Sequence, residues 1–268
     1  MKYFMSVLCV LLLWSGGATA DLIKGLSAEG SCAVIGMTAE QCQLVALQRA
    51  RAAVIEQASG VEVSSSTLVT DFKLAADFIK TYSKGLVVKE KVEWLPLGQY
   101  QKDRSTAPIP EYRVQVVADV FTPTPKVASI GLSVKMNRAL FRNGEQAQVE
   151  IHTGRKAYVA IFNLMANDEV VMIFPNRHDK DNLVEGALVF PAKTSSTELV
   201  MQTLPDHERD AEALLIAALD PIAAQNFTTL FTPDQPLKLT EFFSRYAELA
   251  EWGEDTIVAY EVVKAKAR

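Results

Sequence analysis

Cysteine and histidine are both scarce in this chain of 268 residues, which has three of each. Cys9 lies in an apolar N-terminal stretch, so only Cys32 and Cys42 are left in the rest of the chain. The histidines lie far from this pair, at His152, His178 and His207. Two cysteines with no histidine nearby leave the tetrahedral ligand set of a zinc site incomplete. A catalytic thiol would likewise need a histidine partner, so both kinds of site are disfavoured.

An excess of positive charge is also lacking, because 27 Lys and Arg residues stand against 32 Asp and Glu and the formal net charge is -5. Acidic and basic residues are interleaved along the chain, and no basic patch with aromatic residues is present. Nucleic acid is therefore not an expected partner. Apolar residues, in contrast, make up 49% of the sequence, which is ample for buried cores and excludes disorder for most of the chain.

Sequence motifs of enzymes are missing as well. The chain has no glycine-rich loop of the GxGxxG or P-loop type and no recognisable Ser/His/Asp arrangement. The run Ser64–Thr67 lacks the glycine elbow that a serine nucleophile needs. The run His207–Asp210 is charged but lacks the HExxH spacing, and a charge run of this kind is typical of an exposed face. We therefore expect no enzymatic activity, no catalytic residues and no cofactor.

The N-terminus has the pattern of an export signal. Lys2 precedes an apolar run at 4–14, which is followed by the helix-breaking residues 15–17 and by Ala18–Ala20. This order is typical of a cleavable signal with a small-x-small cleavage site, and the run is shorter than the ~20 apolar residues of a membrane span. We predict that residues 1–20 are removed, that Asp21 becomes the mature N-terminus, and that the protein is periplasmic or extracellular. No transmembrane anchor is expected after cleavage.

Export favours one interpretation of Cys32 and Cys42. An even pair of cysteines in an oxidising compartment is typical of a disulfide. Such a bond would join the end of the first predicted strand to the first turns of the helix that follows. Two free buried thiols are the open alternative.

Two prolines mark a division of the chain. The segment 121–126 reads Phe-Thr-Pro-Thr-Pro-Lys, which stiffens the backbone and cannot join a central strand or a helix. We predict a linker at 122–126 between a domain at 21–121 and a second domain at 127–268.

The first predicted domain combines helices and short strands. Thr38 followed by Gln41 is a capping-box pattern, and apolar residues then recur at helical spacing as far as Ser59 and Gly60, with Arg51 off the apolar stripe. A second helix is predicted at 71–82, and a hairpin tip at 99–110. Strands are predicted at 28–37, 61–63, 85–92 and 112–121. The expected fold class is α+β, with helices on one face of a small sheet.

The second predicted domain is mainly β. Alternating or apolar segments predict strands at 130–134, 147–152, 157–164, 170–174, 188–191, 197–202 and 213–219, with a turn at 166–168. Strands at this spacing are typical of a sandwich-like or barrel fold. A helix at 239–252 and a strand at 256–263 are expected to follow.

Several segments of this half resemble one bacterial envelope family. They are Tyr158–Asn163, Val170–Arg177, Asp181–Asn182, Gly144–Glu145 and Val189–Pro191. Together they resemble family 4384 of domains of unknown function, whose signature is an apolar strand, a turn and a Leu-Phe-Pro-Asn-like motif before a charged loop. Ile173 stands where the family usually has Leu. The resemblance covers roughly 130–219 and implies a β-rich, non-catalytic module, often appended to exported or signalling proteins.

The N-terminal half resembles a second family more loosely. Small residues on a helix at 46–53, the segments 58–63 and 64–67, Ser83–Gly85 and the strand at 112–116 are similar to the first domain of flagellar assembly protein T and related envelope lipoproteins. This resemblance implies that a flagellar apparatus is one setting for the protein.

The dense polar cluster after Phe174 is the candidate binding site. Its residues are Asn176, Arg177, His178, Asp179, Asp181 and Asn182. A calcium loop is disfavoured, because the expected glycine is missing and position 190 is Phe rather than Glu; no metal is expected. Phe174 should anchor the turn in the core, Pro175 should end the strand, and the Asn176 side chain should bond the backbone across the turn.

These features lead to one main functional prediction and two alternatives. The main prediction is an exported, non-catalytic binding or assembly module of the bacterial cell envelope, whose partner is another envelope protein. One alternative is a periplasmic hydrolase acting on envelope material, which would need a cleft that gathers His178, Asp179 and distant carboxylates. The other is a sensor that binds a small ligand in the β-rich domain.

Overall fold

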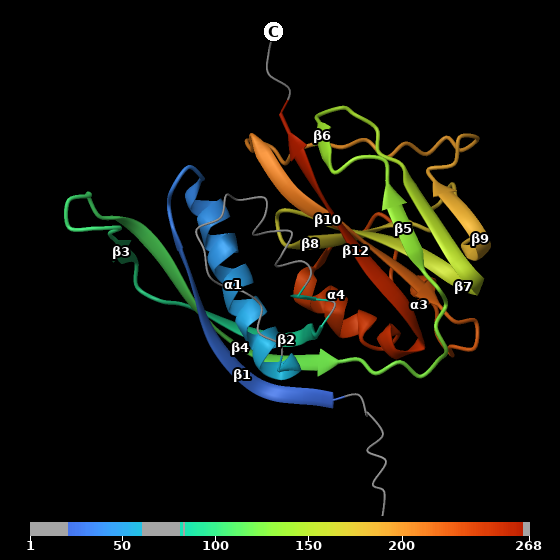
Figure 1. Cartoon of the computed structure of the whole chain (residues 1–268), viewed down its shortest axis with the longest axis horizontal. Coiled ribbons are helices and arrows are strands. Elements are labelled where there is room, and N and C mark those ends of the chain that lie inside the picture. Colours follow the sequence, from blue (N-terminus) through green and yellow to red (C-terminus); the bar gives the residue numbers. More distant parts are fainter. Residues whose placement is uncertain (1–20, 61–80, 83, 265–268) are drawn as a thin grey trace, which may run out of the picture.

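The computed structural model describes residues 21–60, 81–82 and 84–264, and its fold is β-rich, as predicted (Figure 1). The described strands form two separate sheets. The predicted signal at 1–20, the strand at 61–63 and most of the helix at 71–82 lie outside the described residues.

The first sheet is antiparallel and has the order β1-β4-β2, with β3 also paired to β4. Its strands are β1 (Asp21–Ala33), β2 (Leu86–Trp94), β3 (Gly98–Tyr100) and β4 (Ile109–Thr122). The predicted hairpin tip at 99–110 is confirmed, since Gln99 lies opposite Pro110. The strand predicted at 28–37 starts and ends earlier than expected, because β1 pairs with β4 from Asp21 onward.

Helix α1 (Ala39–Ser59) packs closely on this sheet. The capping box is confirmed: the Thr38 hydroxyl accepts the Gln41 N–H, and the Gln41 side chain accepts the Thr38 N–H. Small residues allow the close approach, because a Cβ added at Gly30 would lie 2.0 Å from the Ala46 carbonyl oxygen. Ala46 and its neighbour one turn on, Ala50, are fully buried. The small-residue pattern of α1 is therefore a packing feature.

Cys32 and Cys42 form a disulfide, as predicted, with their Cα atoms 5.5 Å apart, a distance typical of bridged cysteines. Both side chains are buried. The bond joins the end of β1 to the first turn of α1 and so fixes the start of the helix on the sheet.

The second sheet has the order β11-β8-β7-β10-β12-β6, and β5 and β9 also pair with β7. Its strands are β5 (Ser133–Met136), β6 (Leu140–Arg142), β7 (Val149–Leu164), β8 (Glu169–Phe174), β9 (Leu183–Phe190), β10 (Arg209–Leu219), β11 (Leu237–Lys238) and β12 (Gly253–Val263). Helices α3 (Phe227–Leu230) and α4 (Leu239–Tyr246) and the short 3-10 helix η1 (Ala250–Trp252) lie between β10 and β12 in sequence.

Strand β7 pairs with different neighbours along its two halves. Its first half pairs with β5 and β9, its second half with β8 and β10, and the register with β9 is interrupted between Thr153 and Ala157. The strands predicted at 147–152 and 157–164 are therefore one. The strand predicted at 197–202 is wrong, because that segment forms only an isolated bridge between Gln146 and Val200.

Strand β10 is buried on both faces. Ala213, Leu215 and Ala217 belong to one hydrophobic cluster. The residues between and after them, Leu214, Ile216 and Ala218, belong to a second cluster. Burial on both faces explains the uninterrupted apolar run at 213–219.

The hydrophobic cluster that contains Ala213, Leu215 and Ala217 is shared by the two sheets. Phe162 of β7 packs edge-on or tilted against four aromatic side chains, including Phe242 of α4 at 4.9 Å between ring centroids. Phe243 of α4 contacts Tyr82 at 4.6 Å, and α4 lies between β2 and the strands β10 and β12 (Figure 1). The chain crosses from β4 to β5 through the proline segment, but the division into two domains stays a prediction because this core is common to both.

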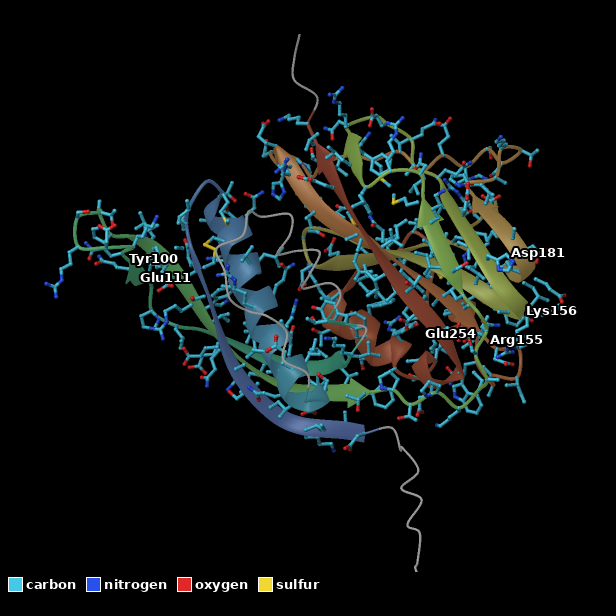
Figure 2. The ribbon with its side chains drawn as sticks, viewed as in Figure 1. Tyr100, Glu111, Arg155, Lys156, Asp181 and Glu254 are labelled. Atoms are coloured by element: carbon cyan, nitrogen blue, oxygen red, sulfur yellow. A yellow bond between two sulfur atoms is a disulfide. The ribbon has the colours of Figure 1, made fainter. Side chains whose placement is uncertain are left out.

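Side chains from the second sheet hold the segment that follows the prolines (Figure 2). The Arg155 guanidinium donates to the carbonyl oxygens of Ala128 and Ser129. The Glu254 carboxylate accepts the N–H groups of Ile130 and Leu132 at 2.9 and 3.0 Å. The connection between the sheets is therefore fixed to β7 and β12.

Arg51 lies off the apolar stripe of α1, yet its side chain is only 2% exposed. It donates to both oxygens of Glu90 on β2, at 2.6 and 2.8 Å, and to Asp168 in the turn after β7, at 2.9 Å. The Thr240 hydroxyl also donates to Glu90, at 2.7 Å. Burial acts to raise the pKa of Glu90, but the Arg51 guanidinium outweighs it and lowers the pKa.

Candidate functional site

The loop 175–182 leaves β8 as the sequence predicts. Phe174, the last residue of β8, is 2% exposed and packs against Phe190 with 5.2 Å between ring centroids. Pro175 follows at the point where the strand ends. Phe174 therefore anchors the start of the loop in the core.

Asn176 organises the turn. Its Oδ1 accepts the backbone N–H groups of His178 and Asp179, both at 2.8 Å, and its Nδ2 donates to the Ile173 carbonyl at 2.9 Å. The predicted side-chain bond across the turn is confirmed, and the asparagine is almost fully buried. Its role in the loop is conformational.

Three further candidate residues also hold the loop in place through hydrogen bonds. Oδ2 of Asp179 accepts the hydroxyl protons of Ser195 and Thr197, at 2.9 and 2.5 Å. Asn182 donates to the Val159 carbonyl at 3.0 Å, and exposed Asp181 accepts the Leu183 N–H at 3.3 Å. These bonds tie the far side of the loop to β7, β9 and the segment 195–197. Asp179 therefore bonds to hydroxyl groups. It does not bond to His178, which is the contact that a hydrolase site would need.

Arg177, His178 and Lys180 are the exposed side chains of the loop that bear nitrogen. Nε of Arg177 donates to Nε2 of His178 at 3.0 Å. The two terminal guanidinium nitrogens have no partner among the described residues. Lys180 was not among the binding residues predicted from the sequence.

A shallow hollow of about 460 Å³ lies beside Arg177 and Lys180. It is lined by Pro175, Asn176, Arg177, Lys180, Thr228, Pro233 and Asp234. The structure thus brings together Asn176 and Arg177 of the predicted set, whereas His178, Asp179, Asp181 and Asn182 do not line the hollow. Arg177 and Lys180 outnumber the single carboxylate of Asp234, so the hollow favours an anionic group, which a guanidinium can bind through two parallel hydrogen bonds.

A larger cleft of about 670 Å³ lies between the start of α1 and the start of β10, where the sequence suggested no site. Its lining comes from 36–48 on the first sheet's side, from Ala166 in the turn after β7, and from 206–211. Sequence reasoning missed this cleft because its walls come together only through the packing of the two sheets.

The run His207–Asp210 lies in this cleft and is not wholly exposed. Asp210 is 3% exposed, which contradicts the expectation for a charge run. Its Oδ1 lies 2.6 Å from Nδ1 of His207, and its Oδ2 accepts the Leu204 N–H at 2.6 Å. Asp210 therefore orients the imidazole toward the cleft and holds the loop before β10.

Glu212, two residues further on β10, belongs to a buried polar group. It is 4% exposed, and its Oε2 lies 2.5 Å from the Tyr260 hydroxyl and 3.1 Å from Nδ2 of Asn163. Burial raises the pKa of this carboxyl, although the hydrogen bonds from Tyr260 and Asn163 oppose the shift.

Two searches over the described part of the chain were negative. Within 21–60, 81–82 and 84–264, no group of three or more His, Cys, Asp or Glu side chains is placed to hold a metal ion. None of the helices in those residues has the length and apolar character needed to cross a membrane.

Comparison with known proteins gives a match to a protein family. Residues 140–205 match the family described as "Domain of unknown function (DUF4384)". This segment runs from β6 through β9 and includes the loop 175–182, so the resemblance to that family is confirmed there. No curated protein matches the chain, and the resemblance to flagellar assembly protein T stays a prediction.

Proposed function

We propose that this protein is an exported, non-catalytic binding module of the bacterial cell envelope, which captures another envelope protein through the loop 175–182. One observation carries the proposal: Arg177 and Lys180 are exposed beside a hollow, on a loop that Asn176, Asp179 and Asn182 fix in place. A rigid loop loses little conformational entropy when it binds, which favours recognition.

The proposed location rests on the sequence pattern at 1–20 and on the cysteine pair. A small-x-small site after an apolar run is typical of export, and a disulfide persists in an oxidising compartment. Both features favour the periplasm or the cell exterior. A flagellar or other surface apparatus is one setting for such a module.

The chemistry of the loop indicates the kind of group it would recognise. The free terminal nitrogens of Arg177 form a planar donor pair that matches a carboxylate, and Lys180 adds a second positive charge. We therefore expect the partner to present Asp or Glu side chains, or a chain-terminal carboxylate, to the hollow.

Quantitative capture from envelope fractions tests this proposal. Immobilised wild-type protein, Arg177→Ala and Lys180→Ala would be compared, with the exposed Lys135→Ala on β5 as the matched control. We expect the two loop variants to lose the same set of captured proteins and the control to retain it. Equal capture by all four proteins would contradict the loop as the binding site.

A further inference from the structure

The first residues of β10 have a neighbouring strand on only one side. Strand β10 pairs with β12 along its whole length, from Arg209 to Leu219. Its pairing with β7 begins only at Ala213, which lies opposite Leu164, the last residue of β7. Within the described residues 21–60, 81–82 and 84–264, the segment 209–212 is therefore an open sheet edge on the β7 side.

The ladder shows which backbone groups face that open side. At its two ends, the Lys264 N–H donates to the Glu208 carbonyl, and the Asp220 N–H donates to the Trp252 carbonyl, both at 2.9 Å. Because alternate residues of an antiparallel strand face the same partner, the even-numbered residues of β10 bond to β12. The N–H and C=O groups of Arg209 and Ala211 consequently face the side that β7 leaves open, and they have no hydrogen-bond partner among the described residues.

The larger cleft lies at this same edge. Arg209 and Ala211 line it, and the opposite wall is a face of α1 that includes Leu44, Val45 and Gln48. The cleft is thus bounded by unpaired backbone groups on one side and by an apolar helix face on the other. An extended peptide chain can satisfy both, since its main chain pairs with a strand edge while alternate side chains point to opposite faces.

The charges around the cleft define the peptide further. Asp206 and Glu208 are exposed in its lining, where Glu208 pairs with Lys264 at 3.2 Å and Arg209 pairs with Glu261 of β12. The acidic surroundings complement basic side chains, and the α1 face complements apolar ones.

We propose that this cleft binds an extended segment of a partner protein, in which apolar and basic residues alternate and whose main chain pairs with Arg209 and Ala211 as an added strand. The added strand takes the place beside β10 that β7 leaves at Leu164. Its apolar side chains pack on Leu44 and Val45. This surface is built from residues other than those of the loop 175–182, so it does not depend on the function proposed for that loop.

A synthetic peptide provides the probe. A fluorescein-labelled heptapeptide of alternating Val and Lys would be titrated with the full-length protein, and binding would be followed by fluorescence anisotropy. The matched control is the same peptide N-methylated at alternate residues, which keeps the side chains but removes main-chain donors. We expect the unmethylated peptide to bind and methylation to weaken binding about tenfold or more, in line with the loss of one or more hydrogen bonds.

Ala211 offers the corresponding test on the protein. Proline at 211 removes the N–H that faces the cleft, and it leaves the bonds to β12 intact because those come from the neighbouring residues. We expect Ala211→Pro to weaken the peptide about fivefold to tenfold, and Ala211→Ser, which keeps the N–H, to bind as the wild type does. If Ala211→Pro fails to fold, the comparison of the methylated and unmethylated peptides is the test of the proposed site.

Three results would overturn the proposal. The first is the absence of peptide binding to the wild-type protein. The second is equal binding of the methylated and unmethylated peptides. The third is a dimer in sedimentation experiments that the peptide does not dissociate, because the edge would then be occupied by a second copy of the chain.

Discussion

The Tyr260 hydroxyl lies between two acceptors, 2.5 Å from Oε2 of Glu212 and 2.8 Å from Oδ1 of Asn163. A tyrosine has one hydroxyl proton, so it can satisfy only one of them. Nδ2 of Asn163 donates to Glu212 as well, so Glu212 and Oδ1 of the amide compete for the tyrosine proton. If Oδ1 takes it, the contact between Glu212 and Tyr260 is a hydrogen bond only when Glu212 is a protonated acid that donates to the tyrosine oxygen.

The raised pKa of Glu212 leads to a pH prediction. Burial raises the pKa of Glu212 above its ordinary value of 4.5, so the folded state binds this proton more tightly than the unfolded state does. The resulting stabilisation is complete below the unfolded pKa and is lost as the pH rises through the folded pKa. We expect Glu212→Gln, whose amide is always neutral, to reduce the fall in unfolding free energy between about pH 4 and 8.

Denaturant unfolding of the wild type and of Glu212→Gln across that pH range measures the difference. Burial also raises the pKa of Asp255 and of Glu261, so only the difference between the two proteins reports on Glu212. Parallel pH profiles would show that Glu212 is ionised in the folded protein.

The second prediction concerns the buried guanidinium that links the two sheets. Arg51→Met leaves the carboxylates of Glu90 and Asp168, which are 12% and 16% exposed, without their cation. Removing one member of a buried ion pair costs about 3–5 kcal/mol, because the remaining charge is buried and unpaired. Urea unfolding should show this loss, whereas Arg113→Ala, which breaks the exposed pair with Glu29, should change the unfolding free energy by less than about 1 kcal/mol. Similar effects of the two variants would contradict the role given to Arg51.

The third prediction concerns the bond between Cys32 and Cys42, which are 10 residues apart in sequence. Closing a loop of this size stabilises a folded protein by about 3 kcal/mol in the chain-entropy description. We expect Cys32→Ser with Cys42→Ser to lower the midpoint of denaturant unfolding, and reduction of the wild type to have the same effect. Thiol titration of unreduced, denatured protein checks the bond itself, since neither Cys32 nor Cys42 should react.

A fourth prediction follows from the sequence pattern at 1–20. Cleavage after Ala20 gives a mature chain that begins at Asp21, the first residue of β1. Intact-mass measurement of protein taken from the periplasm should give the mass of residues 21–268. A mass that includes Met1 would show that the segment is retained.

Local patterns predicted most of the second sheet but few of its polar contacts. The apolar run at 213–219 and the capping box at Thr38 depend on neighbours in sequence, so both could be predicted. The burial of Arg51 could not, because its partner Glu90 lies 39 residues away and its partner Asp168 lies 117 residues away. The burial of Asp210 likewise depends on the packing of a whole loop.

The same distinction holds for the candidate sites. Asn176 could be assigned to the turn because its partners lie within three residues of it. The open edge at Arg209 and Ala211 could not, because it depends on where the register of β10 with β7 stops. The predicted strand at 157–164 ends at Leu164 as β7 does, but the strand predicted at 213–219 leaves out residues 209–212, with which β10 begins.

The last prediction separates anchoring from recognition at the candidate loop. Phe174→Ala removes a buried ring that contacts Phe190, so it should lower the unfolding free energy by about 3–5 kcal/mol. Arg177→Ala removes an exposed side chain whose one protein hydrogen bond goes to His178, so it should leave the melting temperature nearly unchanged while weakening partner capture. Thermal unfolding and envelope capture, measured on both variants, give the comparison. If Arg177→Ala instead lowers stability and capture together, the arginine serves the fold of the loop, and its guanidinium is not the recognition group.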